Sequence, residues 1–202
     1  MRIFILDTEY LSWSKKQSNI KLKNIRLKNQ NAEIINLYSK EIFTNKKKQI
    51  ENFFKPFKFK NYPYRISKLT GISKTFLDKS GKSFKLSYKK IVSFFPKNSI
   101  IITNGGDEKV LNLNIDLYDI KKINKRVYFL NLQDIIYKFI IKNKDHLPFI
   151  STNKIKKVMK LNKIKSHNAK NDVKIIQKFL SKNNIQKKNI IHLKNKFVEQ
   201  IL

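Results

Sequence analysis

The sequence predicts an α/β protein built on a mixed sheet of five strands flanked by helices on both faces. Three strand-like segments occupy the first part of the chain, and helical and strand patterns alternate after them, an order typical of a layered α/β sheet. Residues 99–103 form a continuous apolar run, as in a strand buried on both faces. With 202 residues, 41% of them hydrophobic, the chain can form a substantial core.

The expected strands of the N-terminal part are separated by a polar segment. Residues 2–8 contain the apolar run Ile-Phe-Ile-Leu, and residues 32–43 carry a second apolar set. Residues 12–31 are polar and basic, so we expect an exposed turn or loop between these strands. The aromatic residues of 53–57 predict a third strand, or sheet edge, that ends near Pro63.

Helical patterns begin near Ile66 and dominate the rest of the chain. In chain order, we expect a helix from Ile66 to about Leu77, a helix at 83–95, the buried strand at 99–103, a helix at 107–117 and a fifth strand at 126–130. Helices are then expected at 131–143, 152–161 and 167–181, and residues 186–202 fit a last helix or a tail.

The charge of the chain is strongly unbalanced. Lys and Arg number 45 against 14 Asp and Glu, which gives a formal net charge of +31. This sign suits a polyanionic partner such as nucleic acid. An AT-rich genome, which enriches Lys, Asn and Ile, explains the magnitude equally well, so both interpretations stay open.

Cysteine and long apolar runs are both absent from the sequence. The first absence excludes disulfides and Cys-ligated zinc. The apolar run at residues 3–6 is too short for a signal peptide, and no run approaches the roughly 20 apolar residues that span a bilayer. We therefore expect a cytoplasmic protein that does not associate with a membrane.

Two acids follow the first apolar run as Asp7-Thr8-Glu9. Residues i and i+2 of a strand point to the same face, so Asp7 and Glu9 project together. Two adjacent carboxylates repel each other unless a cation lies between them, and oxygen ligands suit Mg²⁺ or Mn²⁺. This pair alone is weak evidence, because the exposed end of a strand looks the same.

Asp107 lies just beyond the carboxyl end of the strand at 99–103, where ligands bind in open α/β sheets. The preceding Gly105 and Gly106 permit a tight turn and a close backbone approach. A simple helix cap at Asp107 is an equally good explanation of that residue alone.

His167 and Asp172 stand five residues apart at the start of the last strongly patterned helix. Both can reach one site if His167 lies in the loop or first turn and Asp172 lies one turn inside, with Ser166 as the N-cap. A single histidine at such a place is usually an ordinary surface residue. The order and spacing of all five residues together are much harder to obtain by chance.

These motifs resemble those of the DEDDh family of 3′-to-5′ exonucleases, which have a ribonuclease-H-like fold. Asp7 and Glu9 match its first motif, Asp107 the second, and His167 with Asp172 the third. The sequence Leu-Thr-Gly-Ile at 69–72 also matches a family signature. The resemblance implies an exonuclease domain over residues 1–182, and residues 183–202 fall outside it as a basic helix or tail.

The resemblance also implies a mechanism. Asp7, Glu9, Asp107 and Asp172 would hold two divalent ions, Mg²⁺ or Mn²⁺, and His167 would act as the general base. Nucleoside 5′-monophosphates would be released from the 3′ end of single-stranded RNA or DNA, with RNA favoured by the Leu-Thr-Gly-Ile and Gly-Gly-Asp sequences. Many relatives are homodimers, but no interface is identifiable here.

Three residues around the first motif are candidates for contact with the substrate: Thr8, Tyr10 and Trp13. Tyr10 replaces the Thr or Ala common in the family, and both aromatic rings could stack on bases or simply pack. Two other classes of function remain as alternatives. One is a non-catalytic nucleic-acid-binding module on the same fold, and the other is a basic structural protein of a ribonucleoprotein.

Overall fold

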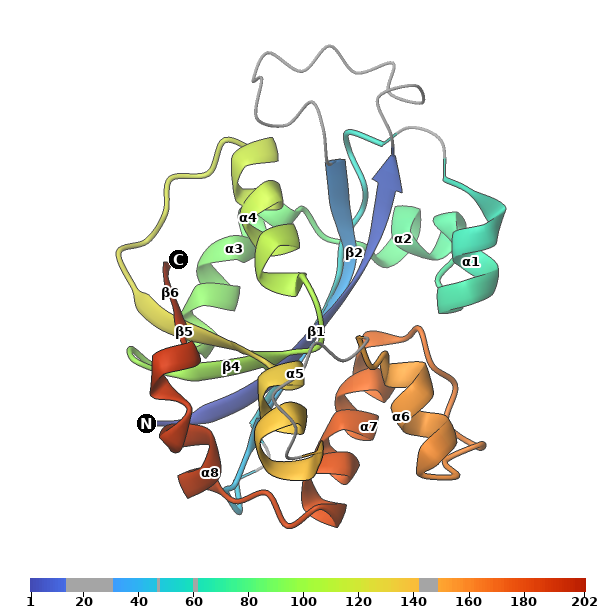
Figure 1. The fold of residues 1–202 in the computed structure, drawn as a ribbon. Coiled ribbons are helices and arrows are strands. Elements are labelled where there is room, and N and C mark those ends of the chain that lie inside the picture. The colour runs from blue at the N-terminus through green and yellow to red at the C-terminus, as the bar shows by residue number, and fades with distance from the viewer. Residues whose placement is uncertain (14–30, 47, 60–61, 142–148) are drawn as a thin grey trace.

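A computed structural model describes residues 1–13, 31–46, 48–59, 62–141 and 149–202. These residues form a six-stranded mixed sheet with the strand order β3-β2-β1-β4-β5-β6 and helices on both faces (Figure 1). The strands are β1 (Ile3–Trp13), β2 (Asn31–Ile42), β3 (Gln49–Phe53), β4 (Ile100–Thr103), β5 (Arg126–Asn131) and β6 (Val198–Ile201). The predicted fold class is confirmed, and the predicted count of five strands is wrong by one.

The helices follow the predicted alternation with the strands. They are α1 (Tyr64–Thr70), α2 (Lys74–Ser80), α3 (Phe84–Phe94), α4 (Asp107–Leu117), α5 (Leu132–Ile135), the π-helical η3 (Ile136–Ile141), α6 (Thr152–Val158), α7 (Ala169–Lys182), α8 (Lys187–His192) and the 3₁₀-helical η4 (Lys194–Lys196). Within the described ranges, no helix has the length and apolar character needed to cross a membrane.

The central strand β1 organises the two faces of the sheet. Because side chains alternate along a strand, Ile3 and Ile5 enter the core beneath α5, α6, α7 and α8, whereas Phe4 and Leu6 enter the core beneath α3 and α4. All four side chains are buried. Continuing this alternation, Asp7 lies on the α7 face of the sheet.

Strand β1 separates from β4 close to the predicted site. The two strands pair in parallel only from Ile3 to Ile5, whereas β1 stays paired with antiparallel β2 along its whole length. A bulge between Glu9 and Tyr10 interrupts that second pairing. The segment of β1 that carries the predicted motif is therefore free of β4, so other parts of the chain can approach it (Figure 1).

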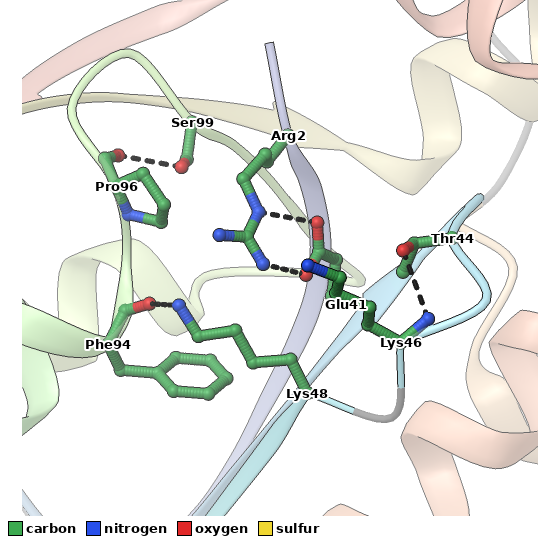
Figure 2. A network of polar contacts seen from close by, with 8 residues as sticks. All are labelled: Arg2, Glu41, Thr44, Lys46, Lys48, Phe94, Pro96 and Ser99. Atoms are coloured by element: carbon green, nitrogen blue, oxygen red, sulfur yellow. Dashed lines mark hydrogen bonds and ion pairs between the residues drawn. The ribbon is translucent and has the colours of Figure 1, made fainter.

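The opposite end of β1 is anchored by polar contacts (Figure 2). The Arg2 guanidinium forms a two-pronged ion pair with the Glu41 carboxylate, which is largely buried. Lys48 Nζ donates a 2.7 Å hydrogen bond to the carbonyl of Phe94, the last residue of α3. The first contact connects β1 to β2, and the second connects the β2–β3 turn to α3. Both lie at the end of β1 that is remote from the predicted site.

Three predicted segments differ from the structure. The helix expected from Ile66 to about Leu77 is divided at Gly71, whose φ is 77°, into α1 and α2. Most of the loop expected at 12–31 lies outside the described residues. The third strand lies at Gln49–Phe53, earlier than the predicted 53–57. The chain cannot continue as a strand after it, because Pro56 lacks an N–H and the backbone amides of the next three residues donate to the Glu33 carboxylate.

Residues 183–202, expected to be a basic helix or tail, contain α8 and then continue into β6. This strand pairs antiparallel with β5, and Leu202 is fully buried, so the segment completes the same sheet.

Candidate active site

All of the predicted site residues except Trp13 line one cavity of about 550 Å³. It lies beyond the carboxyl end of β4, where β1 has left that strand. The five predicted catalytic residues contribute to its wall: Asp7, Glu9, Asp107, His167 and Asp172. Thr8 and Tyr10, predicted to contact substrate, line it as well, whereas the side chain of Trp13 lies outside the described part of the structure.

Three of the carboxylates form a tight cluster. One oxygen from each of Asp7, Glu9 and Asp172 lies within 4.8 Å of the other two. The first two project together from β1 because they are two residues apart, and α7 packs on that face of the sheet and supplies the third. This is the grouping of oxygen ligands that a hard divalent cation prefers.

Asp107 approaches from the other face of the sheet, at the first turn of α4. Its Oδ1 accepts two hydrogen bonds from Thr8, one from the backbone amide at 2.9 Å and one from the hydroxyl at 2.7 Å. Thr8 points away from Asp7 and Glu9, as the alternation of a strand requires. Asp107 thus lines the cavity without belonging to the three-oxygen cluster.

His167 and Asp172 are connected through the backbone. The amide of His167 donates a 3.3 Å hydrogen bond to Asp172 Oδ2, and His167 adopts the left-handed conformation with a φ of 61°. Few residues other than glycine adopt this conformation, so the bond helps to hold a costly turn. Asn168 caps α7 by accepting from Asn171 N, in place of the predicted Ser166.

In the metal-free site, burial and mutual repulsion favour the protonated forms of the acidic groups. Burial raises the pKa of Asp7 well above its usual range and that of Glu9 to about 8, and the neighbouring carboxylates add to both shifts. Burial likewise raises the pKa of Asp172 to about 7 and that of Asp107 to about 6, the latter against the opposing effect of the Thr8 hydrogen bonds. A bound cation would reverse these shifts.

A partly buried amide network at the wall of the cavity was not predicted. Gln133 Nε2 donates to Asn104 Oδ1 at 2.6 Å and to the Ile150 carbonyl at 3.0 Å, and Gln133 Oε1 accepts from the Ile150 amide at 3.0 Å. These bonds fix the chain next to Phe149, whose ring lines the cavity. Single amide residues carry no recognisable pattern in a sequence, so only the structure identifies them.

Comparisons with known proteins detect a relationship in structure alone. No protein-family model matches the chain, and no curated protein matches it. The cell-death related nuclease CRN-4 superposes with a TM-score of 0.66 at 15% identity, over 96% of this chain and 64% of that one.

Two further solved structures share the fold. The nuclease domain of 3′hExo, a DEDDh family member bound to rAMP, superposes with a TM-score of 0.63 at 15% identity, over 98% of this chain and 96% of that one. Escherichia coli exonuclease I in complex with a dA16 oligonucleotide gives 0.62 at 15% identity, over 95% of this chain and 42% of that one. The chain therefore has the fold of the DEDDh-type 3′-5′ exonucleases.

Proposed function

We propose that this chain is a divalent-metal-dependent 3′-to-5′ exonuclease that releases nucleoside 5′-monophosphates from single-stranded nucleic acid, with RNA favoured over DNA. One observation carries the proposal. Asp7, Glu9 and Asp172 gather within 4.8 Å, and Asp107 and His167 line the same cavity. Chance or simple stability does not explain this grouping, because clustered buried acids oppose one another.

The chemistry of the cluster fits a metal site. Asp172 Oδ1 is buried and has no hydrogen-bond partner, an arrangement that is costly unless something else meets that oxygen. Asp7, Glu9 and Asp172 would hold a divalent ion, with Asp107 as the remaining acidic ligand. Bound Mg²⁺ or Mn²⁺ would polarise the phosphodiester and make a water acidic enough to lose its proton near neutral pH.

His167 is the residue suited to take that proton. Its side chain lines the cavity and is only partly exposed, and its backbone is fixed by Asp172. An imidazole ordinarily changes protonation near neutral pH, which is what a general base requires. The bond between the two residues would keep the proposed base and a proposed metal ligand together at the start of α7.

The structural neighbours support the class of substrate. One of them is bound to rAMP and another to a dA16 single strand. The net charge of +31 favours a polyanion, and the cavity is within the size range of sites that enclose most of a small ligand. The preference for RNA rests on the Leu-Thr-Gly-Ile sequence at 69–72, the Gly-Gly-Asp sequence at 105–107 and the rAMP-bound neighbour.

A nuclease assay with matched variants tests the proposal. The wild type should degrade single-stranded RNA and DNA with Mg²⁺, and EDTA should stop it. Asp172→Asn should lose at least about a thousandfold in rate, since it removes a charged ligand of the metal site. Asp78→Asn is the matched control, because Asp78 is an exposed acid paired with Lys74 outside the cavity. Binding without any cleavage by the wild type would instead indicate a non-catalytic module.

A further inference from the structure

A hollow of about 380 Å³ lies between α7 and β2 and shares no lining residue with the catalytic cavity. Tyr38 and Val173, both buried, line its base. Four cationic side chains surround them: Lys40, Lys170, Lys174 and Lys178. The proposed catalysis gives this hollow no role.

The lysines of the hollow differ from ordinary surface lysines. In a chain with 45 Lys and Arg, one lysine on an exposed helix face needs no explanation. Here two elements bring four of them together, and no acid of the described residues lines the hollow. Lys170 pairs with Glu51 at 3.3 Å, whereas the other three form no ion pair with a described acid. Like charges gathered in this way repel each other, and a bound anion would relieve the repulsion.

A second hollow of about 360 Å³ continues the first, because Gln177 and Ser181 line both. No lysine lines this one, and its apolar lining consists of Ile42, Phe43, Leu180 and Ile185. The two hollows form one groove beside α7, here called the α7 groove, with a basic end and an apolar end. From Lys170 to Ser181, α7 rises about 16 Å, a length that about five residues of an extended peptide cover.

Phe43, at the apolar end of the α7 groove, is both exposed and strained. Its side chain is 40% exposed, and its φ of 59° lies in the left-handed region that bulky residues rarely adopt. Asparagine or glycine would adopt this conformation at a lower cost in free energy. Strain of this kind is found where a side chain serves a contact, which here is a contact with a group in the groove.

We propose that the α7 groove binds an extended acidic peptide segment of a partner protein, with its carboxylates on the lysines and a bulky apolar side chain against Phe43. The complementary charge at one end and the apolar lining at the other match such a segment. A nucleic-acid strand matches the groove less well, because its charge recurs at every nucleotide whereas the lysines are confined to one end. The proposal does not depend on the proposed function.

Fluorescence polarisation of a labelled peptide tests the basic end. The probe contains four acidic residues, a serine and two leucines, with both termini blocked. The wild type should bind it, and the double variant Lys174→Glu, Lys178→Glu should bind it at least about 10-fold more weakly. Lys89→Glu with Lys90→Glu is the matched control, because these lysines of α3 are exposed outside the groove and the net charge changes equally. Equal losses in both double variants would refute a specific site.

The apolar end is tested separately. Phe43→Asn should weaken binding of the probe at least about 5-fold without lowering the free energy of unfolding, because asparagine tolerates a positive φ. A probe with serines in place of the leucines should bind the wild type and Phe43→Asn equally. A leucine probe that binds both proteins equally would contradict the predicted contact.

Two further outcomes would overturn the proposal. One is the absence of probe binding by the wild type. The other is a loss in Lys174→Glu, Lys178→Glu that affects a 3′-blocked single strand but not the peptide, which would assign the groove to nucleic acid. The same double variant should cleave a dinucleotide at the wild-type rate, because neither lysine lines the catalytic cavity. Failure of the peptide to bind therefore leaves the proposed function untouched.

Discussion

Thr8 donates both its backbone amide and its hydroxyl to the same oxygen, Oδ1, of Asp107. These residues lie 99 positions apart, and the bonds join β1 to the first turn of α4. Asp7 and Glu9 flank Thr8 and project to the opposite face of the sheet. The contact therefore sets the position of the acid from α4 relative to the two acids from β1.

Removing the Thr8 hydroxyl should loosen this connection. Thr8→Val keeps the shape of the side chain but takes away one of the two buried hydrogen bonds, which should cost about 1–3 kcal/mol of the free energy of unfolding. It should also raise the pKa of Asp107 further and weaken Mg²⁺ binding. Denaturant unfolding and Mg²⁺ titration measure both effects. Thr8→Ser, which keeps the hydroxyl, is the control, and wild-type behaviour of Thr8→Val would refute the positioning role.

The raised pKa values predict an unusual pH dependence of the metal-free protein. Burial lifts the pKa of Glu9 to about 8 and that of Asp172 to about 7, so the folded protein binds more protons than the unfolded chain from about pH 4 upward. The contribution of these groups to the free energy of unfolding must then fall as the pH rises towards 8. Saturating Mg²⁺ should stabilise the protein most at the alkaline end of that range.

Unfolding in EDTA at pH 5 and pH 8 measures this effect. Asp172→Asn should reduce the loss of stability between the two values, because it replaces one raised carboxyl and lessens the repulsion on Glu9. Asp78→Asn should leave the loss unchanged. The same pH profile in Asp172→Asn and the wild type would mean that the cluster does not carry these shifts.

Gln133 should matter for both stability and substrate binding. Gln133→Ala removes the hydrogen-bond partner of the Ile150 amide and of Asn104 Oδ1, which should cost about 1–3 kcal/mol of the free energy of unfolding. Because the segment beside Phe149 loses its support, KM should rise more than kcat falls. Gln177→Ala, which removes one partly buried bond to Lys40, is a milder control. An unaltered KM in Gln133→Ala would mean that this network does not shape the cavity wall next to Phe149.

The dependence of binding on salt separates functional charge from compositional drift. A dinucleotide carries only one or two phosphates and contacts nothing beyond the site, so its affinity should fall only shallowly with salt. A long strand should show a steeper fall if basic segments such as residues 182–196 also contact it. The affinity of the His167→Ala variant for both lengths, measured from 50 to 200 mM salt, tests this. Over that range, a protein that neutralises several phosphates loses about 10³-fold in affinity. Equal shallow slopes would mean that the charge of +31 is not used for binding.

The sequence predicts the centre of this fold better than its edges. The apolar run of β1 and the buried run of β4 identify the central strands, because strands covered on both faces must be apolar. Strand β6 escapes prediction because it is a short edge strand, Val-Glu-Gln-Ile, whose side chains stay partly exposed. Its place in the sheet depends on pairing with β5, which no local pattern reveals.

The same contrast holds within the site. Asp7, Glu9, Asp107, His167 and Asp172 can be predicted because acids are rare in this chain and their spacing matches a known pattern. The contacts that position them cannot be predicted in this way. The Thr8 bonds and the Gln133 network join residues far apart in the sequence, and they depend on how α4 and α6 pack.

The direction of cleavage tests the central claim most directly. A single strand labelled at its 5′ end should shorten one nucleotide at a time with Mg²⁺, releasing nucleoside 5′-monophosphates, and a blocked 3′ terminus should resist. Asp7→Asn should be inactive on the same strand. Stepwise loss from the 3′ end in the wild type is the result that we predict. Cleavage of a circular single strand, or undiminished activity of Asp7→Asn, would contradict it.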